Sequence, residues 1–143
     1  MGHAEAAVEL GPWNALRTEA IAVRHAVFVA EQLVPEDLEV DDFDPVSVHA
    51  LARDVDGAAI GTGRLLPDGH IGRLAVLARA RGRGVGSALL RALMDESRRR
   101  GNREAMLNAQ VQAVPFYERY GYAAEGEPYD DAGIAHIAMR CRL

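Results

Sequence analysis

"RARGRGVGSALLRAL" (residues 79–93) combines a glycine-rich loop with the start of a helical pattern. Gly82, Gly84 and Gly86 fall within five positions, and apolar residues recur from Val85 onward at the spacing of one helix face. A helix N-terminus presents unpaired N–H groups and a partial positive charge, and glycines let an anion approach the backbone closely. The stretch therefore predicts a loop that binds a phosphate or diphosphate. A tight strand-to-helix turn without a ligand is the alternative.

Two common nucleotide-binding motifs do not fit this loop. A P-loop needs a lysine in GxxxxGK[ST], and all 16 basic residues of this chain are arginines. A dinucleotide fingerprint, GxGxxG, needs a glycine where Ser87 stands. Arg81 and Arg83 would instead add positive charge at the rim of the loop. Nucleotide binding through either motif is therefore the weakest alternative.

Around this loop the sequence predicts a single α/β (α+β) domain over residues 1–143, because a chain of this length builds one core. The expected helices are residues 14–30, with Asn14 as N-cap, residues 85–100, ended by Gly101, and residues 115–120. The expected strands are residues 48–54 and 58–66, joined by a tight turn at Asp56-Gly57, then 70–77, 104–109, a strand from Tyr122 onward and 134–143. The strand–helix–strand order over 70–109 implies a crossover to a parallel neighbour.

Charge is distributed unevenly along the chain. The net charge of −5 argues against a general nucleic-acid binder. Residues 31–44, a long loop or short helical piece, carry seven acids and no arginine, whereas residues 79–103 carry eight arginines. We therefore expect the first region to attract cations and the second to attract anions.

The sequence also indicates where the protein works. No apolar run reaches the roughly eighteen residues of a membrane helix, and residues 1–10 lack the pattern of a secretory leader. Cys141 is the single cysteine, so no intramolecular disulfide or thiolate cluster can form. His3, His25 and His49 do not have the spacing of metal ligands. We expect a cytoplasmic protein without a bound metal or a membrane partner.

Two segments together resemble a known family. "RGRGVG", between a strand and a helix, resembles the (Q/R)xxGxG/A element of the GNAT acetyltransferase superfamily. "NAQVQAVPFYERYGY" (108–122) resembles the later segment of that superfamily, with Gln110 where an asparagine is usual and Tyr117 at the tyrosine position. "VRHAVFVAEQ" (23–32), the acidic loop, His49 and "DDAGIAHIAM" (130–139) are similar to the ElaA-like branch. The resemblance runs from about residue 13 to the C-terminus.

This resemblance implies the GNAT fold, a mixed, mostly antiparallel sheet whose central parallel strands splay apart, flanked by helices. It implies acetyl-CoA as cosubstrate, with the main-chain amides of the glycine loop on its diphosphate. The pantetheine arm would lie between strands 70–77 and 104–109, and the Val76 N–H would stabilise the oxyanion. The cofactor-binding residues implied are Leu74, Ala75, Val76, Arg81, Gly82, Arg83, Gly84, Val85, Gly86, Ser87, Gln110, Phe116 and Tyr117.

The resemblance also suggests catalytic residues. It places Tyr117 near the departing sulfur as general acid, although an aromatic core residue is the alternative. The candidates for the general base are His70, Glu31 and His136, beside a base relayed through water. Their alternatives are an exposed turn histidine, a solvated helix-end glutamate and a hydrogen-bonded strand histidine.

The function that the sequence favours is N-acetyl transfer from acetyl-CoA to a primary amine of a small molecule or a protein, by direct attack. The acidic residues 31–44 favour a cationic amine, with a solvated loop as the alternative. A noncatalytic module that senses acyl-CoA is the competing function. We also expect that the protein can form a homodimer, because dimers are common for this fold.

Overall fold

The computed structural model describes residues 7–143, so His3 lies outside the described residues. Two antiparallel sheets form its framework. The first has the strand order β1 (Ala7–Pro12), β2 (Val48–Arg53), β3 (Ala59–Leu65) and β4 (Ile71–Val76). The second has the order β5 (Glu104–Gln110), β7 (Ile134–Arg142) and β6 (Ala123–Asp131).

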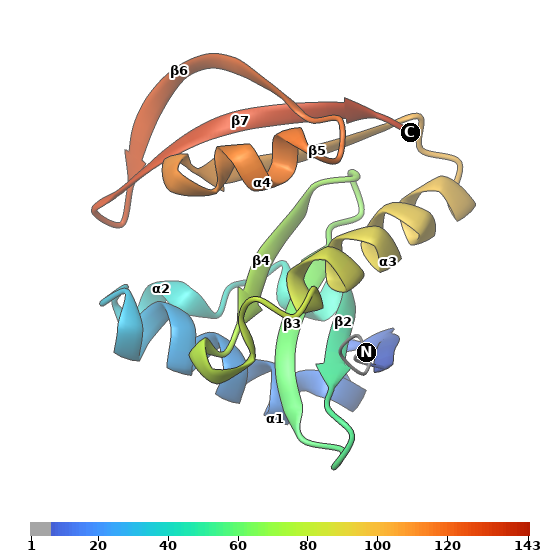
Figure 1. The fold of residues 1–143 in the computed structure, drawn as a ribbon, viewed down its shortest axis with the longest axis vertical. Coiled ribbons are helices and arrows are strands. Elements are labelled where there is room, and N and C mark those ends of the chain that lie inside the picture. The colour runs from blue at the N-terminus through green and yellow to red at the C-terminus, as the bar shows by residue number, and fades with distance from the viewer. Residues whose placement is uncertain (1–6) are drawn as a thin grey trace.

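The two sheets meet at a single parallel bridge. It joins His70, just before β4, to Met106 in β5. Beyond this bridge β4 and β5 no longer pair, and the two strands diverge in a V (Figure 1). The predicted α/β class and the splayed parallel strands are thus confirmed, with the sheet divided into two parts.

Helices α1 (Trp13–Arg24) and α3 (Val85–Arg99) cover opposite faces of the first sheet. Leu51 of β2 packs with Leu16 and Ala20 of α1, while the neighbouring Ala50 and Ala52 join the main core beneath α3. Successive strand residues point to opposite faces, so the two helices must lie on different sides. The sheet, with β4 at its edge, is packed between the two helices.

Two glycines of β3 let α3 approach the sheet closely. A Cβ atom at Gly61 would lie 2.9 Å from Cδ1 of Leu89, and one at Gly63 would lie 2.9 Å from Cδ1 of Leu93. Both leucines are fully buried. The close packing places the N-terminus of α3, which begins after Gly84, beside the end of β4.

Several sequence expectations need correction. Strand β1 was not predicted, and α1 begins directly after it, so Pro12 and not Asn14 is the N-cap. The predicted helix 14–30 changes at His25 into a π-helix, η1 (His25–Glu31), because periodicity alone does not separate these helix types. The β2–β3 loop spans Asp54–Ala58, since Asp54 and Ala58 bond to each other, and Gly57 has a φ of 85°.

The remaining elements border the opening between the sheets. On one side lie α2 (Glu36–Glu39) and the 3-10 turn η2 (Asp44–Val46). The turns η3 (Ala78–Ala80) and η4 (Val111–Ala113) follow β4 and β5, and η4 leads into α4 (Val114–Glu118). Within residues 7–143, no helix combines the length and apolar character needed to cross a membrane.

Candidate active site

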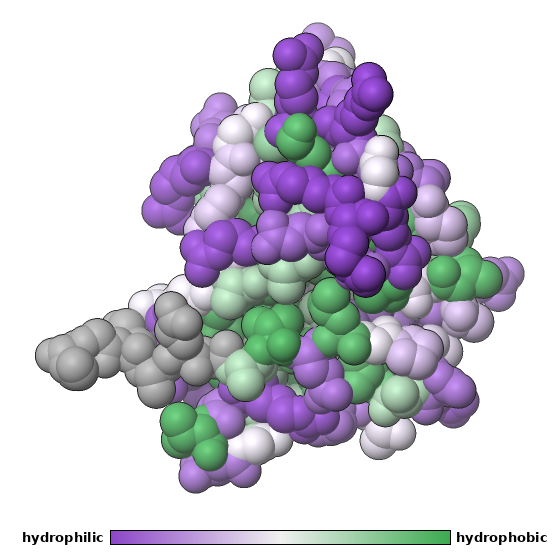
Figure 2. All heavy atoms as spheres, turned by 90° about the vertical axis from the view of Figure 1, so that its right-hand side faces the viewer, coloured by the Kyte–Doolittle hydropathy of each residue, from purple (hydrophilic) through white to green (hydrophobic). Residues whose placement is uncertain are grey.

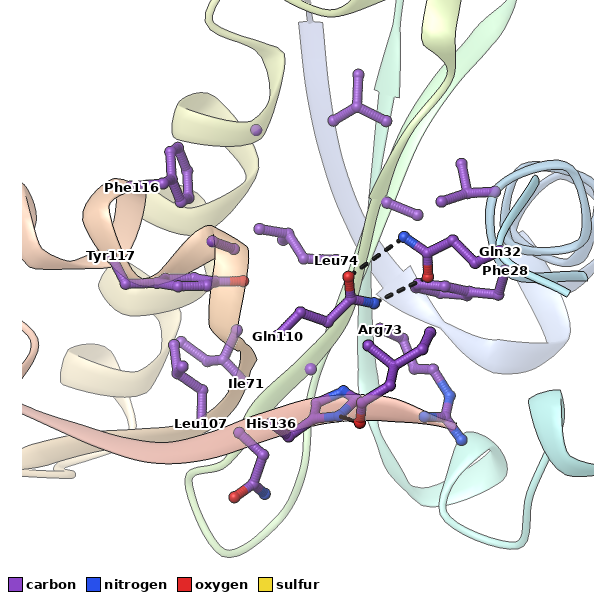
Figure 3. A pocket seen from close by; sticks show the side chains of 18 of the residues that line it. Phe28, Gln32, Ile71, Arg73, Leu74, Leu107, Gln110, Phe116, Tyr117 and His136 are labelled. Atoms are coloured by element: carbon purple, nitrogen blue, oxygen red, sulfur yellow. Dashed lines mark hydrogen bonds between the residues drawn. The ribbon is translucent and has the colours of Figure 1, made fainter. Parts of the chain in front are cut away.

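A cleft of about 980 Å³ occupies the opening between β4 and β5. Its walls come from segments far apart in the sequence: η1, β4, the glycine loop, β5, α4 and the β6–β7 hairpin. Figure 3 shows side chains from these elements pointing toward one another across the cleft. The volume is ordinary for a small-molecule or cofactor site.

The glycine loop forms an open cradle of main-chain groups. Gly82 and Gly84 both have a φ of 79°, a conformation that favours glycine, and a Cβ atom at either would meet nothing within 4 Å. Gly84 caps α3 without a side-chain hydrogen bond, and Ala88 N–H is the donor to its carbonyl. The preceding amides in the first turn have no partner within the helix. The loop therefore leaves both space and donors for an anion.

Strand β4, which precedes the glycine loop, carries a bulge beside the cleft. Thr62 pairs with Ala75 and Arg64 with Gly72, so two residues of β4, Arg73 and Leu74, lie opposite Gly63 alone. Arg73 has a φ of 49°. A Cβ atom at Gly63 would lie 2.8 Å from Cδ1 of Leu74. A side chain at position 63 would therefore collide with the bulge.

The end of β4 exposes main-chain groups to the cleft. Leu77 N–H donates to Ile60 O at 2.9 Å, toward β3. Because successive strand residues alternate their hydrogen-bonding edges, the N–H and C=O of Val76 and Leu74 face away from β3. The Val76 carbonyl accepts from Arg81 Nε at 3.1 Å. The bridge at His70 is the only pairing of this edge with β5 within residues 7–143, so the Val76 N–H faces the cleft.

Tyr117 points its hydroxyl group into the cleft from α4 (Figure 3). Its ring packs edge-on against Phe116 and Tyr122, with centroids 5.1 and 5.9 Å away. Burial raises the pKa of Tyr117 to about 12. No hydrogen-bond partner for its hydroxyl lies within the described part of the chain, so the neutral phenol has a proton to donate.

The glycine cradle, the bulged strand and the tyrosine together agree with the comparison with known families. The family model described as "Acetyltransferase (GNAT) domain" matches residues 14–143. The chain belongs to the GNAT acetyltransferase family. The ElaA-like resemblance agrees with a structural match to Escherichia coli ElaA, at 25% identity and a TM-score of 0.83, covering 95% of this chain and 99% of that one.

Two further relatives of this acetyltransferase are more similar in sequence. An acyl-CoA N-acyltransferase from Pseudomonas aeruginosa is 33% identical, with a TM-score of 0.83 and coverage of 95% and 99% of the two chains. The "Uncharacterized N-acetyltransferase YjcF" of Bacillus subtilis is 39% identical over 125 residues, 85% of this chain and 89% of that protein. These matches extend over nearly the whole domain.

The predicted cofactor residues surround the cleft with one exception. Most of them line it, but Arg83 does not, and this exposed arginine has no ion pair within residues 7–143. Arg81 lines the cleft and forms an ion pair with Glu31, with both N–O distances at 2.7 Å. Ser87 Oγ accepts a hydrogen bond from the Tyr120 hydroxyl. The acetyltransferase thus holds two of its predicted phosphate-binding side chains in internal contacts.

The three candidate bases all line the cleft, but their surroundings differ. The guanidinium of Arg81 binds both oxygens of Glu31 and holds the pKa of this carboxyl below its usual value. His70 lies at the closed end of the V, where its Nδ1 is 2.9 Å from Oδ2 of Asp68. His136 lies in β7 and lines the cleft, and its Nδ1 is 2.8 Å from Ile134 O.

The hydrogen bond between His136 and the Ile134 carbonyl determines which ring nitrogen can accept a proton. A carbonyl oxygen can only accept, so Nδ1 carries the proton in the neutral ring and Nε2 keeps the lone pair. The ring stacks on Tyr129 with centroids 6.0 Å apart. His136 therefore offers a fixed acceptor nitrogen from a half-buried position beside the cleft.

Gln32 is a cleft residue to which the sequence interpretation gave no role. Its amide forms two hydrogen bonds with Gln110, of 2.8 and 3.3 Å, from the end of η1 to the end of β5 (Figure 3). Gln112 also donates to Gln110 Oε1 at 2.6 Å. Gln32 ends the quoted segment 23–32, but no sequence signal links it to a residue 78 positions away.

Four of the seven acids in residues 31–44 pair with arginines inside the protein, and two of these four, Glu31 and Glu39, line the cleft. Glu39 and Asp44 are buried and bind Arg24, while Asp41 binds Arg64. Among the acids that line the cleft in the described chain, Asp68 and Asp131 have no arginine partner, and Asp68 lies 2.9 Å from the ring of His70. The segment therefore supplies little unpaired negative charge to the cleft.

Some arginines of residues 79–103 also pair with acids inside the protein. At the far end of α3, Arg98 binds Asp95, while Arg99 and Arg100 bind Glu96. Figure 2 shows the side of the molecule that carries this end of α3, and its upper half is mainly hydrophilic. Within residues 7–143, no group of three or more His, Cys, Asp or Glu side chains is arranged to hold a metal ion.

Proposed function

We propose that this acetyltransferase uses acetyl-CoA and transfers the acetyl group to a primary amine by direct attack. The observation that carries the proposal is the position of the glycine cradle, which opens onto the same cleft as the free edge of β4 and the Tyr117 hydroxyl. The cradle would bind an anion, β4 presents a main-chain donor, and α4 presents a proton donor. This combination suits a thioester that carries a diphosphate.

The residues present fit coenzyme A. A Cβ atom would occupy the empty space above Gly82 and Gly84, so the cradle has room for a phosphate. Arg81 and Arg83 would add charge, and the main chain of Leu74 to Val76, with Ala75 between them, would pair with the pantetheine amides. Phe116 packs beside the loop, 3.6 Å from the position of a Cβ atom at Gly86, and would give the arm an apolar wall.

In the proposed reaction His136 Nε2 accepts a proton from the amine, and the nitrogen attacks the thioester carbonyl. The C–N bond forms while the carbonyl electron pair moves to oxygen, where the Val76 N–H stabilises the negative charge. The electron pair then returns from oxygen to carbon, the C–S bond breaks, and Tyr117 donates its proton to the leaving thiolate. The Tyr117 phenolate regains a proton from the His136 imidazolium through solvent. A cationic amine would find its unpaired carboxylate at Asp131.

The decisive test is thiol release from acetyl-CoA in the presence of a panel of amines, amino acids and peptides. Release that depends on an amine, with an equal amount of N-acetylated product, supports the enzyme. Binding of acetyl-CoA without release for any amine in the panel contradicts it and favours the acyl-CoA sensor.

Replacing His136 by glutamine tests the assignment of the base. Glutamine keeps a polar group of similar length but cannot take the proton, so kcat falls by about 10²-fold and acetyl-CoA binding stays unchanged. His70→Gln is the matched control, because His70 is exposed at the closed end of the V. A larger loss in His70→Gln than in His136→Gln would overturn the assignment.

Breaking the Arg81–Glu31 pair has opposite effects from its two sides. In Glu31→Gln the guanidinium of Arg81 loses its carboxylate partner and can bind the diphosphate. Acetyl-CoA should then bind about two- to fivefold more tightly, a change that corresponds to the free energy of an exposed ion pair. Arg81→Gln weakens binding by a similar factor or more. Calorimetric titration measures both, with Asp95→Asn as control, since it removes an exposed arginine partner at the far end of α3. Weaker binding in Glu31→Gln would show that the pair supports the site instead of competing with it.

A further inference from the structure

Six charged side chains form a network behind the bulge of β4. They come from α1, the acidic segment, β3 and β4, and their three positive and three negative charges cancel. The members are Arg24, Glu39, Asp41, Asp44, Arg64 and Arg73. The network joins the acidic segment to the wall of the cleft.

The centre of the network is Asp44, which is fully buried. Its Oδ1 is 2.8 Å from Nη1 of both Arg24 and Arg64. Burial works against the carboxylate, but the two guanidinium groups outweigh it and hold the pKa of Asp44 below its usual value. Asp44 therefore remains charged and joins α1 to β3.

Asp41 extends the network to the bulge. Its two oxygens bind Arg64 Nη1 and Nη2 at 2.6 and 2.9 Å, and Arg73 Nη2 lies 3.1 Å from Oδ2. Arg73 Nε also donates to Glu39 O at 3.1 Å. The same carboxylate thus contacts one arginine in β3 and one in the bulge of β4, on both sides of the irregular pairing.

The bulge needs such support because its backbone is strained. A non-glycine residue with a φ of 49°, as at Arg73, lies in the left-handed region and costs about 1 kcal/mol or more. The bulge also determines which edge each later N–H of β4 faces. A shift by one residue would turn the Val76 N–H away from the cleft.

We propose that Asp41 is a positioning residue for acyl transfer: through Arg64 and Arg73 it fixes the β4 bulge and so aims the Val76 N–H at the thioester carbonyl. This inference rests on the proposed function. It assigns the acidic segment a role in holding the oxyanion donor, in place of attracting an amine. Asp41 is the member to test, because its side chain is 30% exposed and its loss leaves the buried centre intact.

The experiment compares Asp41→Asn with Glu19→Gln. Glu19 forms a similar two-point ion pair with Arg53, at 2.5 and 2.7 Å, between α1 and β2 and away from the cleft. Each variant removes one negative charge, from the contact with Arg64 and Arg73 in Asp41→Asn and from the contact with Arg53 in Glu19→Gln. The measurements are kcat, the Kd of CoA, the thermal midpoint, and the ¹³C shift of the carbonyl of bound [1-¹³C]acetyl-CoA.

We expect Asp41→Asn to lower kcat at least about tenfold, because the oxyanion donor would be displaced from its best position but not removed. The Kd of CoA should stay within about twofold of the wild-type value. The bound carbonyl resonance should move toward its position in free acetyl-CoA, and Asp41→Glu should recover part of both effects. Glu19→Gln should change neither kcat nor the resonance.

Other outcomes overturn the inference. It fails if Asp41→Asn keeps both the wild-type kcat and the wild-type resonance, or if the two variants lose activity equally and in proportion to their loss of stability. The proposed function fails separately if the wild-type protein binds acetyl-CoA without any shift of its carbonyl resonance and releases no thiol with any amine.

Discussion

Gly84→Ala is expected to weaken acetyl-CoA binding by about tenfold to a hundredfold. Gly84 has a φ of 79° at the N-terminus of α3, and the space above it is empty. An added methyl group would fill the space in which a phosphate must lie and would hold it away from the amides. Losing one or two charge-assisted hydrogen bonds accounts for a change of this size. Calorimetric titration with acetyl-CoA gives the measurement.

The substitution has a second effect that must be separated from the first. Alanine in the left-handed region destabilises the fold by about 1 kcal/mol whatever it contacts. Gly57→Ala is the matched control, because Gly57 has a φ of 85°, equally open space and a position in the β2–β3 loop outside the cleft. Both variants should lose similar stability, and only Gly84→Ala should lose affinity. Equal affinity in the two variants would contradict the role of the cradle.

Tyr117→Phe should lower kcat by about 10²-fold or more, the range for loss of a general acid, and leave the Kd of acetyl-CoA within about twofold. The phenylalanine ring keeps the contacts with Phe116 and Tyr122, and the hydroxyl it lacks has no hydrogen-bond partner within the described residues. The fold should therefore tolerate the change. Steady-state rates and calorimetry on the same samples separate kcat from binding.

The pH dependence and a neighbouring tyrosine complete this test. Burial raises the pKa of Tyr117 to about 12, so the phenol keeps its proton at neutral pH. At pH values up to about 11, loss of this proton should therefore cause no fall in kcat. Tyr122→Phe is the control, since the hydroxyl of Tyr122 is buried without a partner and Tyr122 does not line the cleft. Parallel loss of binding and turnover in Tyr117→Phe would mean that this residue is structural.

Local signals in the sequence were sufficient for the parts of the site that are local in structure. A glycine loop open to an anion at Gly82 and Gly84 and the helix after it were predicted from glycine chemistry and apolar spacing within about a dozen residues. The divergence of β4 and β5 came from the family resemblance. These predictions needed no knowledge of distant contacts.

The parts that the sequence did not reveal depend on partners far along the chain. Asp41 and Arg64 are 23 positions apart, and Gln32 and Gln110 are 78 apart. A run of acids has the same composition whether it faces water or meets buried arginines, so its pairing could not be read from charge alone. The short β1 lacked a strong alternating pattern and gained its pairing from β2.

The central claim is that the main-chain amides of residues 82–87 hold the diphosphate of coenzyme A. Amide chemical shifts in ¹⁵N-labelled protein test it most directly, with acetyl-CoA compared with S-acetylpantetheine, which lacks the diphosphate. The account predicts large shifts of the Gly84, Val85, Gly86 and Ser87 amides with acetyl-CoA and small ones with S-acetylpantetheine. Unchanged resonances of this loop at saturating acetyl-CoA would contradict it.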